Sequence, residues 1–142
     1  MTISQIFIEE KINLLAGYLK TASGIFDISD DNLIIKSNDI YVLERMFQLG
    51  VEVIIDINNY FIKELNIEPA LDIQSSFKTL ADNNILPKEF ADKIAPVVGL
   101  RNKLVHVYEK LDKSSFVHDF RKNIDDFNLY NAYILKYVKK DQ

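Results

Sequence analysis

Apolar residues recur every three or four positions along most of this chain, and strand-like alternation is scarce. In the first segment these positions form one stripe: Ile8, Ile12, Leu15, Leu19 and Ala22. Such spacing places side chains on one face of an α-helix. Glycine and proline, at 4 and 3 of 142 residues, are too few for a turn-rich β fold. The pattern predicts an all-α fold, an up-and-down bundle of four to five helices.

The second predicted helix, about residues 39–65, is long and mostly apolar. Polar residues at intervals of three or four form one narrow stripe along it: Arg45, Gln48, Glu52, Asp56, Asn59 and Lys63. The polar stretch 27–39 before it is predicted to be a loop, with Ser37 or Asn38 capping the helix. Because one bundle cannot easily cover so much apolar surface, we expect a second copy to pack here in a two-fold dimer.

The second half of the chain is predicted to form shorter helices before a long final one. A short helix is expected over 75–81, and Pro87 suits the first turn of the next. Pro96 and Gly99 interrupt that helix, so the residues after them should lie on a separately directed piece. The final helix should begin at the serine pair 114–115, since serine is a good N-cap.

The composition limits the classes of protein to which the chain can belong. Its length favours one domain over 1–142. With no cysteine, the chain has no disulfide, zinc-thiolate site or thiol nucleophile. The N-terminus lacks the pattern of a secretory signal, and no apolar run approaches the roughly 20 residues that span a bilayer. We therefore expect a cytoplasmic protein with no membrane contact.

The charge is distributed unevenly. A net charge of −4 argues against a general nucleic-acid binder. However, residues 1–99 carry 8 Lys/Arg against 15 Asp/Glu, whereas residues 100–142 carry 9 against 6. The C-terminal part is therefore net basic, although such unevenness also arises by chance in a small protein.

The basic part begins with the run Gly-Leu-Arg-Asn-Lys-Leu-Val-His-Val-Tyr, residues 99–108. Cleaving RNA without a metal ion needs a base, an acid and a positive group near the phosphate. His106 can transfer protons near neutral pH, and Arg101 offers a permanent charge with a donor fork that fits phosphate. Asn102 lies about one helical turn before His106, so its amide could orient the imidazole or a phosphate. These residue types suit a ribonuclease.

The same run resembles the signature of HEPN domains, an Arg followed by a polar residue and, after a short spacer, a His. Tyr108, two residues after the His, is similar to the HepT branch. The resemblance implies a metal-independent endoribonuclease toxin without a cofactor, dimeric, with two motifs meeting in a cleft. It implies catalytic roles for Arg101, Asn102 and His106. It also implies a neighbouring nucleotidyltransferase antitoxin, of the MntA type, that silences the toxin by transferring AMP to Tyr108.

Helical geometry complicates a site built from one motif. On an ideal helix Arg101 and His106 lie about 140° apart, whereas Arg101 and Tyr108 nearly align. A two-fold dimer that brings a second motif across the cleft would resolve this, and so would a helix that loosens after Val105.

Three further polar residues are candidates for a supporting role: Glu52, Asp56 and Asn59. They form either a solvated face or the far wall of the cleft, where a carboxylate could hold Arg101 or tune His106. His118 has no motif around it and is expected on the surface. Two other functions stay open: a non-catalytic HEPN partner that docks the nucleotidyltransferase or senses a nucleotide, and a plain helical interaction protein.

Overall fold

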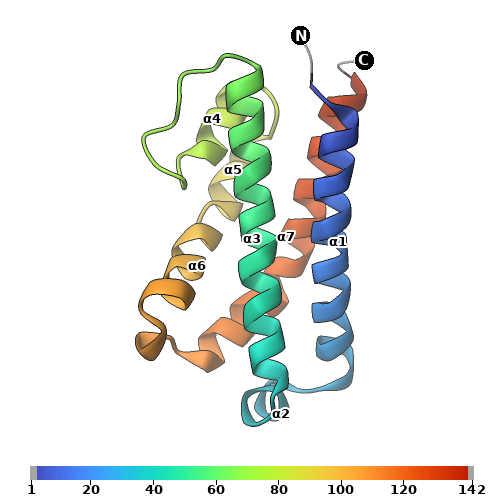
Figure 1. Ribbon diagram of the computed structural model, residues 1–142. Coiled ribbons are helices and arrows are strands. Elements are labelled where there is room, and N and C mark those ends of the chain that lie inside the picture. Colours follow the sequence, from blue (N-terminus) through green and yellow to red (C-terminus); the bar gives the residue numbers. More distant parts are fainter. Residues whose placement is uncertain (1–2, 141–142) are drawn as a thin grey trace.

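The computed structural model describes residues 3–140, which form helices joined mostly by short connections, with a longer one at 65–75 (Figure 1). In chain order these are α1 (Gln5–Ile28), α2 (Asp31–Lys36), α3 (Asp39–Glu64), α4 (Ser76–Asp82), α5 (Lys88–Ile94), α6 (Val97–His106), the 3-10 turn η1 (Tyr108–Lys110) and α7 (Lys113–Lys140). Figure 1 shows α1 and the α5–α6 pair running opposite to α3 and α7. The predicted all-α, up-and-down bundle is confirmed.

The core lies between the long helices, where the apolar stripes meet. Every residue of the predicted α1 stripe is buried. At the centre, Phe47 of α3 packs edge-on against Phe116, Phe120 and Phe127 of α7, with ring centroids 5.4, 5.1 and 5.9 Å away. Edge-to-face contacts of this kind add to the free energy gained from burial. They fix α7 against α3, and α7 begins beside the motif.

Buried polar groups also join the helices. The buried Tyr130 hydroxyl of α7 donates to Asn58 Oδ1 of α3 at 2.6 Å, and the Asn58 amide donates to Ser76 Oγ of α4 at 3.0 Å. Burial raises the pKa of Tyr130 well above its ordinary value, so the phenol stays neutral. The network links three helices through fully buried side chains.

The segment 27–39 differs from its prediction as a loop, because it contains α2. The Asp30 carboxylate caps this helix by accepting from the backbone N–H of Leu33 at 2.9 Å, and Ile34 is fully buried. Arg121 of α7 donates to two backbone carbonyls, one in the last turn of α1 and one in the α1–α2 connection. Contacts with α7 therefore stabilise a helix too short and polar to be recognised from periodicity.

Two helix starts also differ in detail. The final helix begins at Lys113, before the serine pair, and Asp112 Oδ1 accepts from the backbone N–H of Ser115 at 3.1 Å. At the start of α3, Asn38 makes no capping hydrogen bond through its side chain, whereas Ser37 Oγ accepts from the first residue of the helix at 3.2 Å. The Asp112 carboxylate therefore caps the final helix, and the Ser37 hydroxyl, rather than the Asn38 amide, caps α3.

The apolar surface of α3 is covered within one chain, which corrects the sequence argument for a dimer. The helix contacts α1, α2, α4, α6 and α7, and its large apolar residues are mostly buried. Only Tyr41 and Val42, at its start, are large apolar side chains that stay exposed. A second chain is therefore not needed to bury this helix, and the reason for a dimer has to come from the motif. None of the helices within 3–140 has the length and apolar character needed to cross a membrane.

Candidate active site

The motif lies on α6, a short helix set apart from α5 at Pro96, as the sequence predicts. Proline cannot continue the hydrogen-bonding of α5, and the chain restarts as a helix at Val97. Three apolar residues of α6 are buried and fix its orientation: Val97, Val98 and Leu104. The helix packs against α3, beside which it lies in Figure 1. This packing places Arg101 beside Glu52 of the polar stripe of α3.

Arg101 points toward α3 and forms a loose ion pair. Its Nη2 lies 3.7 Å from Glu52 Oε1, too far for a hydrogen bond, and its Nη1 donates to Asn102 Oδ1 at 3.0 Å. Arg101 Nε and Glu52 Oε2 are both buried, and neither has a hydrogen-bond partner in the described part of the chain. The Arg101 side chain is 19% exposed and its guanidinium is not fully hydrogen-bonded, which suits contact with an anion that reaches it from solvent.

The other polar candidates divide between the site and the rest of the surface. Asn102 bonds to Arg101 rather than to His106, so its amide orients the guanidinium. Asp56 pairs with Lys11 of α1 at 3.0 Å, and Asn59 is exposed on α3. Glu52 is thus the one member of the supporting trio that reaches the motif.

His106 is the last residue of α6 and is exposed to solvent. Its imidazole makes no hydrogen bond or ion pair with the residues that the structure describes. Val107, at φ −135° and ψ 47°, ends the helix. Loosening after Val105 was one of two alternatives; the helix instead ends after His106, so Arg101 and His106 both lie on α6 and the dimer alternative stays a prediction. An accessible, unpartnered imidazole at a helix end suits proton exchange with a bound substrate.

Because the helix ends there, the predicted alignment of Tyr108 with Arg101 is wrong. Tyr108 begins the turn η1, and its hydroxyl lies 2.9 and 3.0 Å from the two carboxylate oxygens of Glu44 on α3. Lys113 Nζ lies 3.9 Å from Glu44 Oε2 and 5.2 Å from the centre of the Tyr108 ring. Hydrogen bonding to Tyr108 and the charge of Glu44 raise the pKa of Lys113, although partial burial opposes them. The phenol is held between a carboxylate and an ammonium.

The chain also matches a known protein family. The family model described as "Ribonuclease HepT-like" matches residues 8–134, which include the whole motif. The chain belongs to the HepT-like ribonuclease family. The family predicted from residues 99–108 is therefore confirmed.

Individual relatives agree with this assignment. The chain is 29% identical over 136 residues to the tRNA nuclease HepT of Aphanizomenon flos-aquae, covering 96% of this chain and 92% of the relative. It is 32% identical over 79 residues to the mRNA nuclease HepT of Shewanella oneidensis, covering 56% of this chain and 59% of the relative.

Solved structures share the fold. The tri-AMPylated Shewanella oneidensis HEPN toxin, in complex with an MNT antitoxin, superposes with a TM-score of 0.83 at 24% identity, over 94% of this chain and 99% of that one. YutE, a cytosolic Bacillus subtilis protein of unknown function, gives a TM-score of 0.77 at 19% identity, over 94% and 92% of the two chains.

Glu44 is the site residue that sequence reasoning missed in this HepT-like chain. It is only 7% exposed and contacts the hydroxyl of Tyr108. A signal was present, because Glu44 occupies the helical stripe of Ile40, Phe47 and Val51, all buried. A carboxylate in an apolar stripe requires a polar partner, and Tyr108 and Lys113 supply it.

The two anchors of the site are separated along α3. Glu52 forms the loose ion pair with Arg101, Glu44 accepts the hydrogen bond of Tyr108, and these glutamates are eight residues apart on one helix. At 1.5 Å per residue the separation along the helix axis is about 12 Å. The guanidinium and the phenol therefore belong to one face of this HepT-like fold but do not share one contact point.

Proposed function

We propose that this protein is a metal-independent endoribonuclease toxin of a two-gene module, acting in the cytoplasm on RNA. The observation that carries the proposal is the presence on one short helix, α6, of a guanidinium that is not fully hydrogen-bonded and of an exposed imidazole. Membership of the HepT-like ribonuclease family supports it. The second candidate, a docking module without catalysis, has no use for either group.

The chemistry follows from the two side chains. The 2′-OH of a ribose attacks the adjacent phosphorus, the bond from phosphorus to the 5′-oxygen breaks, and a 2′,3′-cyclic phosphate forms. One imidazole takes the proton of the 2′-OH, and an acid returns a proton to the leaving 5′-oxygen. Arg101, steadied by Asn102 and Glu52, stabilises the negative charge that builds on the phosphate oxygens.

A two-fold dimer would supply the second imidazole. Each chain contributes one His106, and Arg101 lies about 140° from it around α6. The exposed apolar residues Val105 and Val107 flank His106, so a second copy packed there would bury them and bring the two motifs together. We propose this motif-centred homodimer as the active form.

A dimer centred on the motif predicts a specific sensitivity to charge. Val105→Glu is expected to convert a dimer at micromolar concentration into a monomer, because it buries a carboxylate in the interface. Leu129→Glu, at a site on α7 that is similarly exposed, should leave the dimer intact. Light scattering measures both masses. A wild-type monomer, or equal behaviour of the two variants, would contradict the motif-centred dimer.

Cleavage is expected to survive excess EDTA, since a guanidinium and imidazoles supply all the catalytic groups of the proposal. The purified protein would be incubated with labelled RNA in EDTA, and again after adding magnesium or manganese. Activity that disappears in chelator and returns with either ion would overturn the mechanism.

We further propose that a partner nucleotidyltransferase silences the toxin by transferring AMP to Tyr108. The phenol oxygen attacks the α-phosphorus of ATP, and pyrophosphate leaves. The phenolic proton passes to Glu44, which already accepts the hydrogen bond of the hydroxyl. The ammonium of Lys113 then faces the new phosphodiester. The solved relative described as tri-AMPylated and bound to an antitoxin supports this form of control.

The role of Glu44 can be separated from a structural one. Glu44→Gln keeps the size of the side chain but cannot accept the proton, so the rate of AMP transfer should fall about 100-fold, within the usual range for general-base catalysis. Glu52→Gln, two turns further along α3, should leave that rate unchanged. Time-resolved intact mass spectrometry with the partner enzyme and ATP follows both variants. If Glu44→Gln is modified as fast as wild type, Glu44 does not act as the base.

A further inference from the structure

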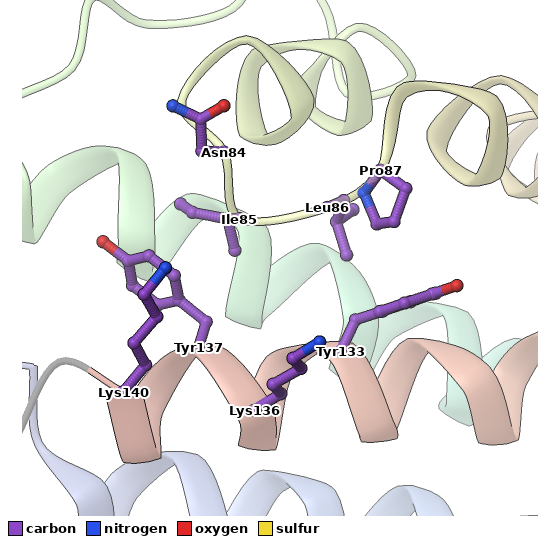
Figure 2. Close-up of a pocket in the computed structure, with 8 residues that line it drawn as sticks. All are labelled: Asn84, Ile85, Leu86, Pro87, Tyr133, Lys136, Tyr137 and Lys140. Atoms are coloured by element: carbon purple, nitrogen blue, oxygen red, sulfur yellow. The ribbon is translucent and has the colours of Figure 1, made fainter.

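One hollow of the described chain lies far from the motif, at the other end of α7 (Figure 2). It has a volume of about 510 Å³, within the usual range for small-molecule sites. One wall is the connection 84–87 between α4 and α5. The other is a single face of α7, where four side chains recur at helical spacing: Tyr133, Lys136, Tyr137 and Lys140.

Two tyrosine rings of this pocket are fixed by the core behind them. The ring of Tyr133 packs against Phe90 of α5, with centroids 4.9 Å apart, and the ring of Tyr137 meets Phe61 of α3 edge-on at 5.6 Å. The rings are thus in place before anything binds, which lowers the entropic cost of stacking a ligand on them. An aromatic wall of this kind accepts the flat face of a base.

Two ammonium groups accompany the rings. Figure 2 shows Lys136 on α7 between the two tyrosines, and Lys140 on the far side of Tyr137. Both are exposed, neither pairs with an acidic side chain within residues 3–140, and no acidic residue lines the hollow. In a chain of net charge −4, a lysine pair that lies beside aromatic rings and has no acidic partner among the described residues is a local site for anions. The chemistry that fits rings and ammonium groups together is a nucleotide.

The distance from the pocket to the motif decides between a free mononucleotide and a nucleotide that is part of a longer RNA. From Lys113, beside Tyr108, to Lys136 the helix α7 runs unbroken for 23 residues, about 35 Å. A mononucleotide in the pocket cannot reach the motif, whereas a polynucleotide can occupy both. We propose that this pocket is a second RNA-binding site, which holds one unpaired nucleotide of the substrate by stacking on Tyr133 and by contacts of Lys136 and Lys140 with phosphate. The proposal rests on the proposed ribonuclease function.

Binding can be measured apart from cleavage in an inactive His106→Ala background. The probe is a fluorescently labelled RNA that wild-type protein cleaves, and anisotropy gives its Kd at several salt concentrations. Lys136→Gln/Lys140→Gln should raise Kd about tenfold and reduce the slope of log K against log salt by about 1.4, or 0.7 for each phosphate contact. The matched control Lys20→Gln/Lys139→Gln removes two exposed charges outside the pocket and should change Kd less than about twofold.

A second pair of variants tests stacking. Tyr133→Leu keeps apolar volume but removes the π face, and should weaken RNA binding about fivefold, whereas Tyr133→Phe should bind as wild type.

Three results would overturn the proposal. If the two double-lysine variants weaken RNA binding equally, the lysines of the pocket contribute only their general positive charge. If Lys136→Gln/Lys140→Gln loses binding of AMP but keeps binding of RNA, the pocket binds free nucleotides instead. If the same variant loses only its binding to the antitoxin, the pocket is a contact site for that partner protein. If wild type cleaves no RNA at all, the proposed function fails independently of the pocket.

Discussion

His106→Ala is expected to abolish both RNA cleavage and growth arrest while leaving the helical fold unchanged. The imidazole is exposed and makes no hydrogen bond or ion pair with the described residues, so the free energy of unfolding should change by no more than about 0.5 kcal/mol. Losing the proton-transfer group should lower the cleavage rate by about 10²- to 10⁴-fold. The chain offers a matched control in His118→Ala, an exposed histidine on α7 outside the motif, which should remain fully toxic.

Arg101→Ala should be equally inactive, but its interpretation needs a second variant. Removing the guanidinium leaves Glu52 as an unpaired carboxylate with one buried oxygen, which costs stability as well as activity. Arg101→Ala/Glu52→Gln removes that cost and should stay inactive. Growth arrest in a bacterial host, with circular dichroism of each purified protein, measures both effects. A toxic His106→Ala protein with intact helices would show that the motif is not the catalytic centre.

Tyr108→Phe is expected to remain toxic and to resist silencing by the partner nucleotidyltransferase. The substitution removes the nucleophilic oxygen but keeps the ring under Lys113, and Lys113 still neutralises Glu44 at 3.9 Å. Loss of the hydrogen bond to Glu44 should cost about 1–3 kcal/mol, which a fold of this size tolerates. Tyr41→Phe is the matched control, because its ring also faces Lys113, at 4.9 Å, and it should be silenced normally.

The measurement is intact mass spectrometry after incubation with the neighbouring nucleotidyltransferase and ATP, followed by peptide mapping. Wild type and Tyr41→Phe should gain adenylyl units at Tyr108, and Tyr108→Phe should gain none. Modification that maps to another residue, or a Tyr108→Phe toxin that is silenced as readily as wild type, would leave simple complex formation as the means of control.

The structure changes how the adduct would inhibit. On a continuous helix Tyr108 would lie beside Arg101, and one phosphodiester would occupy the cation. In the observed fold the phenol faces Glu44 and Lys113, about 12 Å along α3 from the level of Glu52 and Arg101. A first AMP unit therefore meets Lys113 and blocks by volume. If further units are added to the first, inhibition should increase with their number, because each adds volume and negative charge.

Much of this fold was predictable because periodicity is a local property of the chain. The stripe from Ile8 to Ala22 and the break at Pro96 both follow from a few neighbouring residues, and both were found as predicted. The helix α2 was not, because its stability comes from Arg121 and other residues about 90 positions away. The supposed need of α3 for a partner chain was wrong for the same reason, since distant helices cover it.

The candidate site was likewise predictable only where its residues are close in sequence. Arg101, Asn102, His106 and Tyr108 could be selected because they are close in sequence and each has a distinct chemistry. Glu44 contacts Tyr108 across 64 positions, and no local pattern pairs them. Asp56 looked equivalent to Glu52 on the α3 stripe, yet it pairs with Lys11 of α1 instead. Which carboxylate meets the motif depends on where α6 crosses α3, a property of the assembled bundle.

The most direct test of the central claim is the chemistry of the cut ends. Wild-type protein would be incubated with RNA in EDTA, and each fragment would be examined for its terminal groups. If the 2′-OH attacks with help from His106, the upstream fragment ends in a 2′,3′-cyclic phosphate and the downstream fragment begins with a 5′-OH, and RNA with a 2′-deoxy sugar at the cut position resists. Fragments with a 3′-OH and a 5′-phosphate would show that water attacked the phosphorus instead, and would contradict the mechanism built on Arg101 and His106.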